Sequence, residues 1–524
     1  MTELADTATQ TPAAPSEKAR PAYPGLAGAA AAALAVGLTE LFSGLFSNVP
    51  SSLASIGSYI VDWSPHFVTE LAISVFGTSD KGALAIGIAV TAVLLGVVVG
   101  MAAARQAWVA PVAFGGFGLL GFVAATGQPS RSLPATLVTM TVAAGAGWWA
   151  MERLLNVSSA VETPTDGLPG NSERRRFLTG VAGAGALAAT AGFGGRWLTI
   201  RRSETVRTSI GIPTAASTLP ELPAGSSFSV DGLTPIVVPN EDFYRIDTAL
   251  VIPRPEAESW SVTITGMVDR QVSLTLDDLL GRDLVEQYTT ISCVSNEVGG
   301  KLVGNAKWTG VPLAELLDEA GVRDGASQIV GRSVDGWTAG FPTELAIDGR
   351  AALVAVGMND EMLPPVHGFP ARLIVPGLYG YVSATKWLAE IELTTWDGFD
   401  GYWIPRGWAK QGPIKTQSRI DVPNRGQTLV ASGAAIAGVA WAPTRGISKV
   451  EISIDGGEWM ECELSSPLTS DAWVQWKRDV VVAAGSHEVT VRATDGAGET
   501  QTDVETPPAP SGATGWHTAR FVTA

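Results

Sequence analysis

A cysteine in the middle of the chain is the residue best suited to bind a metal or to react with a substrate. Cys293 is one of only two cysteines in 524 residues, and it follows a strand-like stretch at residues 286–292. A loop at a strand end can present a thiolate, which is a soft metal ligand, to a molecule bound in a cleft. A lone cysteine is more often a small buried apolar residue, so the neighbouring motifs carry the interpretation.

A second group of polar residues lies further along the chain. It contains His367, Arg372 and Lys386, together with the hydroxyl groups of Ser383 and Thr385. Glycine and proline in the same run favour a fixed loop. Guanidinium and ammonium groups form strong charge-assisted bonds to phosphate oxygens, so this set suits a bound phosphate.

Together these segments resemble the molybdenum–pterin site of the sulfite oxidase family. The resemblance covers roughly residues 235–524 and rests on the runs 240–245, 289–297 and 358–388. It implies a molybdenum–molybdopterin cofactor whose metal is bound by the Cys293 thiolate. It assigns the pterin ring and phosphate to Asn240, Phe243, Tyr244, Arg245, His367, Arg372, Ser383, Thr385 and Lys386. Besides Cys293, the catalytic residues that it implies are Arg245 and Tyr402.

The chain departs from the family pattern beside the expected metal ligand. Sulfite oxidases follow their cysteine with a run that contains two arginines, whereas residues 294–298 here are Val-Ser-Asn-Glu-Val. Asp247 also stands where the family usually has a histidine. Fewer cations and an added carboxylate weaken the attraction for a dianion. Sulfite as substrate therefore does not follow from the resemblance.

The resemblance implies two-electron oxygen-atom transfer on a small substrate, with electrons exchanged with a separate haem protein or quinone-linked partner. Only four histidines and no CxxCH run occur, so we expect no haem in this chain. An alternative inside the enzyme class is a sulfoxide reductase. A different alternative is a membrane protein whose outer module binds a ligand without turnover, because a fold can persist when its function drifts.

The first 200 residues are apolar and predict membrane spans. Long apolar runs occupy residues 25–46, 82–104, 107–126 and 133–151, each near the length that a spanning helix requires. Residues 52–76 are apolar but carry Asp62, His66 and Glu70, and we interpret them as an amphipathic interfacial helix, with a further span as the alternative.

Three arginines precede the next apolar run. Arg174, Arg175 and Arg176 stand before Phe177 and a weakly hydrophobic segment, which resembles a twin-arginine export signal. A plain positive-inside anchor is the alternative, and both place the arginines in the cytoplasm. We therefore expect a multi-pass protein of the plasma membrane whose second half is extracytoplasmic.

The acidic residues crowd into the second half, which argues against nucleic-acid binding. Residues 260–266 alternate as a strand should, Thr275 is a plausible helix N-cap, and a helix is expected after Pro312. After residue 425, short alternating segments and the turn signal at residues 455–457 predict an immunoglobulin-like sandwich that could form a homodimer.

The predicted fold is therefore multi-domain: an α-helical transmembrane bundle, an α+β sulfite-oxidase-like molybdopterin domain and an all-β immunoglobulin-like sandwich. The predicted segments are a disordered cytoplasmic lead (1–24), transmembrane helices (25–154), a cytoplasmic loop (155–176), a signal-like helix (177–200), a linker (201–228), the molybdopterin-binding domain (229–424) and the dimerisation-type domain (425–524).

Overall fold

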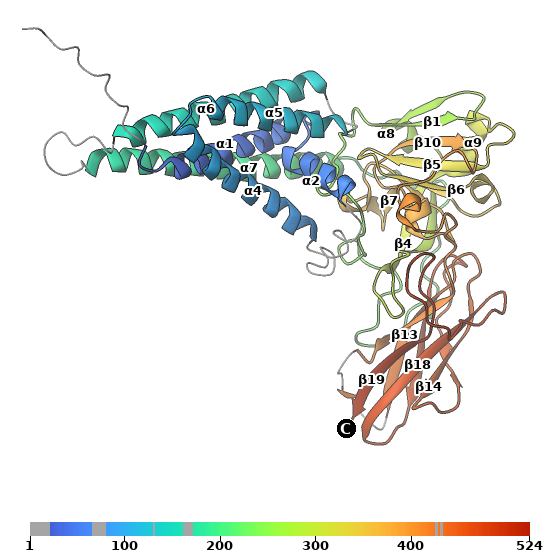
Figure 1. Ribbon diagram of the computed structural model, residues 1–524. Helices are drawn as coiled ribbons and strands as arrows, with labels where there is room; N and C mark the ends of the chain where they lie inside the picture. Colours follow the sequence, from blue (N-terminus) through green and yellow to red (C-terminus); the bar gives the residue numbers. More distant parts are fainter. Residues whose placement is uncertain (1–20, 65–79, 129–131, 161–170, 425–427, 430–432) are drawn as a thin grey trace, which may run out of the picture. The chain divides into compact units, whose positions relative to one another are not determined.

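The computed structural model describes residues 21–64, 80–128, 132–160, 171–424, 428–429 and 433–524. The chain divides into two compact units, residues 1–127 with 131–199 and residues 128–130 with 200–524. The described part of the first unit is helical, and the second consists mainly of β-sheets (Figure 1).

Long apolar helices run alongside one another in the first unit (Figure 1). They are α1 (Pro24–Leu45), α2 (Ser52–Trp63), α4 (Asp80–Ala103), α5 (Val109–Thr126), α6 (Leu133–Ala160) and α7 (Asn171–Ser209), of which residues 200–209 belong to the second unit. Helix α1 packs against α4 at Gly28 and Gly96, where a Cβ on Gly28 would lie 1.9 Å from the Gly96 oxygen. The absence of side chains at both positions lets the two backbones touch, as in many membrane helix pairs.

By length and composition, four helices among the described residues could cross a membrane. They are Pro24–Leu45, Gly82–Ala103, Val109–Thr126 and Arg174–Ser209. Helix α6 forms where a span was expected but is not one of the four, because threonines, glycines and Trp148-Trp149 lower its hydropathy. Of the expected interfacial segment, α2 covers the first part, whereas His66 and Glu70 lie outside the described residues.

Helix α7 is longer than the apolar run that predicted it. It begins at Asn171 and continues past residue 200 to Ser209, into the segment expected to be a linker. No glycine or proline occurs between Arg196 and Ile210, so nothing in the sequence ends the helix earlier. Gly211 and Pro213 follow directly and stop it.

Two five-stranded sheets form the first part of the second unit. The first has the order β2-β1-β10-β5-β6, and the second has the order β3-β4-β7-β8 with β9 paired to β7. Strands of the first are β1 (Ser261–Gly266), β2 (Val272–Thr275), β10 (Leu388–Thr394), β5 (Gln328–Ser333) and β6 (Thr338–Pro342). Strands of the second are β3 (Val285–Ser292), β4 (Val303–Pro312), β7 (Leu353–Met358), β8 (Glu361–Met362) and β9 (Arg372–Ile374).

Short helices connect these strands, and their ends follow local sequence signals. They are α8 (Leu276–Leu280), α9 (Leu313–Ala320), α10 (Gly380–Ser383), η2 (Thr343–Ala346), η3 (Pro365–His367) and η4 (Ile404–Arg406). The prediction that Thr275 is an N-cap is confirmed: its side chain accepts from the Asp278 backbone, and Asp278 completes the capping box. Helix α9 starts after Pro312, as predicted, and ends at Gly321, whose φ of 72° favours glycine.

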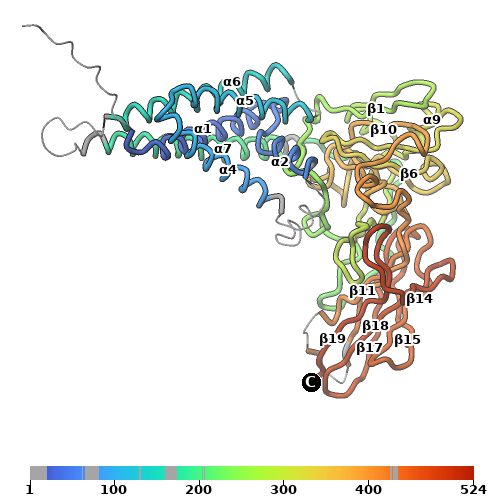
Figure 2. The backbone as a smooth tube through the Cα atoms, viewed as in Figure 1, coloured from blue at the N-terminus to red at the C-terminus, as the bar shows by residue number. Residues whose placement is uncertain are grey.

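Two further sheets form the C-terminal part, with the orders β11-β13-β17-β16 and β12-β19-β18-β14-β15. Their strands are β11 (Gln417–Val422), β12 (Thr428–Leu429), β13 (Ala434–Trp441), β14 (Ile447–Ile454), β15 (Met460–Glu461), β16 (Glu463–Leu464), β17 (Val474–Val480), β18 (Gly485–Asp495) and β19 (His517–Thr523). Strands β18 and β19 run side by side (Figure 2). Residues of both sheets, including Ile436, Trp476, Val491 and Phe521, form one core.

The C-terminal sheets pack against the preceding domain. The Trp473 indole donates to the Ile236 oxygen at 2.8 Å, and Arg419 donates to the Gly300 oxygen at 3.1 Å. Strand β11 already pairs with β13, so the C-terminal sheets begin before residue 425, where the sequence pattern first changes. Most buried apolar residues of β1–β10 lie in a core that also includes Trp441 and Trp473.

Candidate functional site

A cleft lies among the loops of the first two sheets. Six of the residues predicted from sequence line it: Phe243, Tyr244, Cys293, His367, Arg372 and Lys386. They come from the loop before β1, the end of β3, the 3-10 helix η3, strand β9 and the loop after α10. The tertiary structure therefore gathers segments that are far apart in the sequence around one cavity.

Cys293 follows the last residue of β3 and contributes to the cleft wall. Its backbone N–H donates to the Leu302 oxygen at 2.9 Å, and its side chain is 8% exposed. Burial raises the pKa of the thiol, and hydrogen bonding from Ser295 lowers it in part. A thiolate at this depth requires a positive partner, which a bound metal would supply.

Arg372 and Lys386 place two buried cations beside the cleft. The Arg372 guanidinium donates to the His367 oxygen at 3.0 Å and lies 5.0 Å from the Trp308 ring centroid. Within the described residues, its Nε atom is buried and has no hydrogen-bond partner. Burial lowers the pKa of Arg372 to about 10 and that of Lys386 to about 8.

Asp247 neutralises part of this positive charge. One of its oxygens, Oδ2, accepts from Lys386 Nζ at 3.0 Å and from Arg245 Nε at 2.9 Å. Its side chain is only 3% exposed, and the residue lines the cleft. The residue where the family usually has a histidine is therefore a buried counter-ion to two cations.

His367 is buried and in contact with a backbone oxygen, and its imidazole is neutral. Its Nε2 atom lies 2.7 Å from the Asn240 oxygen, and its ring meets the Phe243 ring edge to face. Burial, with the nearby positive charge of Arg372 and Lys386, lowers the pKa of His367 to about 4. The imidazole is therefore uncharged at neutral pH and donates to the Asn240 oxygen.

Aromatic packing orients the wall on the Phe243 side. The rings of Phe243 and Tyr244 are stacked at 5.3 Å, and Phe243 also meets Trp308 edge to face. A Cβ on Gly304 would come within 2.7 Å of the Phe243 ring, so glycine leaves the space that this ring needs. Burial raises the pKa of Tyr244, which keeps its hydroxyl protonated.

The other residues predicted from sequence do not line the cleft. The Ser383 hydroxyl donates to the Tyr379 oxygen at 3.1 Å, and the Thr385 hydroxyl to the Gly331 oxygen at 3.4 Å. Both hydroxyls are buried and bonded to backbone carbonyls, so neither faces an open site for a phosphate. Arg245 lies beside the cleft through its ion pair with Asp247.

Tyr402 also lies outside the cleft wall. Its ring meets Trp403 edge to face at 5.1 Å, and the Arg406 guanidinium stacks on it at 3.7 Å. Trp403, the next residue, lines the cleft. The sequence analysis predicted Tyr402 at this position, whereas its neighbour Trp403 lines the cleft.

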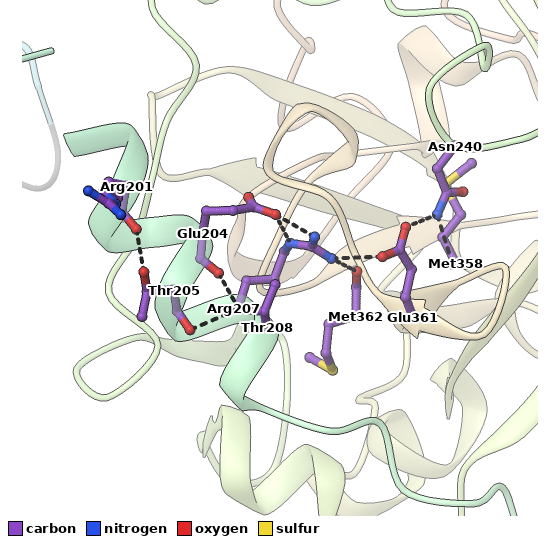
Figure 3. A network of polar contacts seen from close by, with 9 residues as sticks. All are labelled: Arg201, Glu204, Thr205, Arg207, Thr208, Asn240, Met358, Glu361 and Met362. Atoms are coloured by element: carbon purple, nitrogen blue, oxygen red, sulfur yellow. Dashed lines mark hydrogen bonds and ion pairs between the residues drawn. The ribbon is translucent and has the colours of Figure 1, made fainter. Parts of the chain in front are cut away.

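Asn240 acts behind the cleft, in a polar network that begins on α7 (Figure 3). Arg207 donates to Glu361 Oε2 at 3.1 Å, and Glu361 Oε1 accepts from the Asn240 side chain at 2.6 Å. The Asn240 side chain also donates to the Met358 oxygen, while its own backbone oxygen meets His367. The last turn of α7 is therefore connected to a residue of the cleft wall through side-chain contacts.

Sequence reasoning missed several lining residues. They are Ile246, Thr248, Ser295, Asp335, Trp337, Tyr381, Trp387 and Trp408, among others. The concentration of tryptophan in residues 396–408 was the available signal for part of this wall. Asp335 carried no signal, because a turn aspartate is common on any protein surface.

Comparison with known domains identifies the class of protein that this architecture represents. Residues 249–403 match the family "Oxidoreductase molybdopterin binding domain", and residues 411–508 match "Mo-co oxidoreductase dimerisation domain". These domains define a molybdopterin-dependent oxidoreductase. The two matched domains and the curated relatives support a place in the sulfite oxidase superfamily.

The similarity extends to curated proteins of two kinds. The chain is 27% identical over 320 residues to the mitochondrial sulfite oxidase of Rattus norvegicus, covering 52% of this chain and 58% of that protein. It is 28% identical over 315 residues to inducible nitrate reductase [NADH] 2 of Glycine max, covering 48% and 35%. The chain thus spans little more than half the length of the sulfite oxidases that it matches.

Among solved structures, sulfane dehydrogenase SoxCD from Paracoccus pantotrophus is similar to this chain at 22% sequence identity. That similarity has a TM-score of 0.47 and covers 54% of this chain and 80% of that chain.

The residues of the cleft fit a molybdopterin cofactor. Arg372 has a buried Nε donor without a partner among the described residues, and Lys386 provides a second cation for a phosphate. Cys293 adds a sulfur donor in the same cavity, which suits a metal already bound by the soft dithiolene sulfurs of the pterin. In this fit Cys293 would bind molybdenum, while Arg372, Lys386 and His367 would hold the pterin and phosphate.

Proposed function

We propose that this protein is a membrane-tethered molybdenum–molybdopterin enzyme that catalyses two-electron oxygen-atom transfer on a small extracytoplasmic substrate. The observation that carries the proposal is the presence of Cys293, Arg372 and Lys386 in one cleft of the molybdopterin-binding domain. When bound, the cofactor supplies the two-electron redox chemistry and oxygen transfer. The protein supplies ligation, orientation and electrostatics.

Each cleft residue has a specific task in this proposal. Cys293 ligates the metal, and the cations Arg372 and Lys386 bind the phosphate through charge-assisted bonds. Neutral His367 donates one hydrogen bond to the Asn240 oxygen, which fixes the orientation of its ring against Phe243. The buried hydroxyls of Ser383 and Thr385 hold the Arg372–Lys386 segment by bonding to backbone carbonyls.

The apolar helices support the membrane tether. Four of them have the length and composition of spans, and Arg174–Arg176 stand at the start of the last one. We propose that these arginines remain cytoplasmic and that residues beyond Ser209 lie outside, after export through a twin-arginine-like signal. The name of the second matched family supports a homodimer formed through the C-terminal domain, which we interpret as an immunoglobulin-like sandwich.

Electrons would be exchanged with a separate partner, either a haem protein or a quinone-linked carrier. Both buried cations are assigned to the cofactor phosphate, and Asp247 neutralises part of their charge, so little positive charge is left in the cleft for a dianionic substrate. Reduction of a sulfoxide is therefore the second candidate reaction. A comparison of sulfite oxidation with sulfoxide reduction on one preparation separates the two.

The proposal is tested by metal and pterin analysis of the full-length protein, purified in detergent from a molybdenum-replete host. The wild type should carry stoichiometric molybdenum and pterin, and Cys293→Ser should carry little molybdenum. Cys462→Ser is the matched control, because Cys462 is the other buried free cysteine and lies in the C-terminal core. A wild-type protein without either component would contradict the proposal and favour a non-catalytic binding module.

A further inference from the structure

Part of the cleft wall is formed by aromatic rings that are not among the proposed cofactor-binding residues. We call Trp337, Trp403, Trp408 and Tyr381 the aromatic rim. Trp403 and Trp408 meet edge to face with centroids 6.4 Å apart, and Tyr381 lies 6.0 Å from Trp408. The three tryptophans are half-buried, whereas His367 and Arg372 are 3% and 4% exposed. The three tryptophans of the rim are therefore more open to solvent than His367 and Arg372.

Backbone contacts fix the segments that carry these rings. The Tyr402 N–H donates to the Thr338 oxygen at 3.0 Å, which fastens the Trp403 segment to the start of β6, next to Trp337. The Tyr381 hydroxyl donates to the Ala409 oxygen at 2.6 Å, which fastens α10 to the segment of Trp408. The rim is thus a preformed surface made by three parts of the chain.

A carboxylate without an ion pair among the described residues lies beside the rim. Asp335 lines the cleft, and its Oδ1 atom accepts from the Trp337 N–H at 3.1 Å. Within the described residues no ion pair involves Asp335, whereas Lys386 is paired with Asp247. Arg372 donates to the His367 oxygen. A bound cofactor would add the negative charge of its phosphate.

We propose that the aromatic rim and Asp335 bind an alkylated cation, so that the substrates are small organic molecules with a quaternary ammonium or sulfonium group. This inference rests on the proposed function, because it names the substrate class of the same cleft. Aromatic faces attract cations through the ring quadrupole, and Trp is the strongest of them. Quaternary ammonium and sulfonium groups have no N–H to donate, so a site made of aromatic rings and one carboxylate suits them. A small dianion meets like charge here and gains nothing from the rings.

The test uses choline as the probe and its neutral isostere 3,3-dimethylbutan-1-ol as the comparison, with the full-length holoprotein in detergent. Binding is followed by tryptophan fluorescence and by calorimetry. Choline should bind about tenfold more tightly than the isostere, because only choline has the charge that the rings and the carboxylate attract. Equal affinities for the two compounds would overturn the proposal.

Two substitutions locate the binding. Asp335→Asn keeps the shape of the side chain and should weaken choline about fivefold without changing the isostere. Trp403→Leu should weaken it further. Asp324→Asn, at an exposed carboxylate outside the cleft, and Trp516→Leu, in the C-terminal domain, are the matched controls. If Trp403→Leu fails to fold, the isosteric Asp335→Asn still tests the proposal. Unchanged choline affinity in Asp335→Asn would refute cation binding at the aromatic rim.

Failure of this inference is distinguishable from failure of the proposed function. Molybdenum content and redox turnover are measured on the same preparation. A molybdenum-loaded, active protein that does not distinguish choline from the isostere refutes the rim alone. A protein that never carries molybdenum refutes the proposed function, whatever the choline measurement gives.

Discussion

Lys386 Nζ lies 3.0 Å from Asp247 Oδ2, and both side chains are almost completely removed from solvent. A buried ion pair loses much more stability when one partner is removed than it contributes as a pair, because the remaining charge is left without compensation. The same lysine is the proposed phosphate cation. In the cofactor-free protein, Asp247 therefore supplies negative charge that the phosphate would add on binding. The first two predictions follow from this pairing.

Asp247→Asn should lower the free energy of unfolding of the cofactor-free protein by about 3 kcal/mol, since Lys386 and Arg245 lose their shared carboxylate. Cofactor should stabilise the variant more than the wild type, because the phosphate replaces the missing negative charge. Urea unfolding with and without cofactor measures both effects. Asp348→Asn is the control, since Asp348 pairs with Arg350 away from the cleft. A cofactor-free variant as stable as the wild type would contradict the prediction.

Cofactor insertion should depend on the charge of Lys386. Burial lowers its pKa to about 8, so the ammonium is present below pH 8 and is lost as the pH rises through that value. The rate at which apoprotein takes up cofactor should therefore fall between pH 7 and pH 9. In Lys386→Arg the fall should disappear, because a guanidinium stays charged over this range. A wild-type profile that is flat across pH 8 would argue against a phosphate contact at Lys386.

His367 should make the fold sensitive to acid. Its pKa is about 4 in the folded protein, against the ordinary histidine value of 6.5, so the unfolded chain takes up the proton first as the pH falls. The folded state should lose about 3 kcal/mol between pH 6.5 and pH 4 and should show no such loss above pH 6.5.

The measurement is urea unfolding across this pH range, with His367→Gln and His487→Gln compared. His367→Gln should have a much shallower slope, because glutamine takes up no proton. His487→Gln, which removes a half-buried histidine paired with Asp455, should keep the wild-type slope below pH 6.5, because the pairing raises the pKa of His487 above its ordinary value. The half-buried His517, whose pKa is also lowered, contributes part of the slope that remains in His367→Gln. An unchanged slope in His367→Gln would show that this imidazole is not the acid-sensitive group.

The network that begins at Arg207 should affect cofactor retention (Figure 3). Arg207→Gln removes the ion pair to Glu361, which is half exposed. The interactions that hold the Asn240 side chain in place should therefore weaken by about 1 kcal/mol. Molybdenum should dissociate several-fold faster during dialysis, and Arg207→Lys should restore part of the retention. Arg270→Gln, at an exposed arginine of the β1–β2 loop, serves as control. Equal molybdenum retention in Arg207→Gln and the wild type would show that the Arg207 network does not affect cofactor binding.

Local signals in the sequence determined many element ends. The Thr275–Asp278 capping box formed as predicted, because its donors and acceptors lie within one helical turn. The turn after Ile454 formed at Asp455 and Gly456, which both adopt positive φ. Cys293, His367, Arg372 and Lys386 were found for another reason, because the runs that contain them resemble the cofactor site of the sulfite oxidase family.

Tertiary packing alone decided which way the remaining side chains point. Whether Tyr402 or Trp403 lines the cleft depends on the hydrogen bond of the Tyr402 N–H to Thr338, which is far away in the sequence. The hydroxyls of Ser383 and Thr385 turn to backbone carbonyls that the fold brings close. The runs that resemble the sulfite oxidase family thus indicated the chemistry expected of the chain. The placement of Asp247 and of the aromatic rim was decided by long-range packing, which no local pattern encodes.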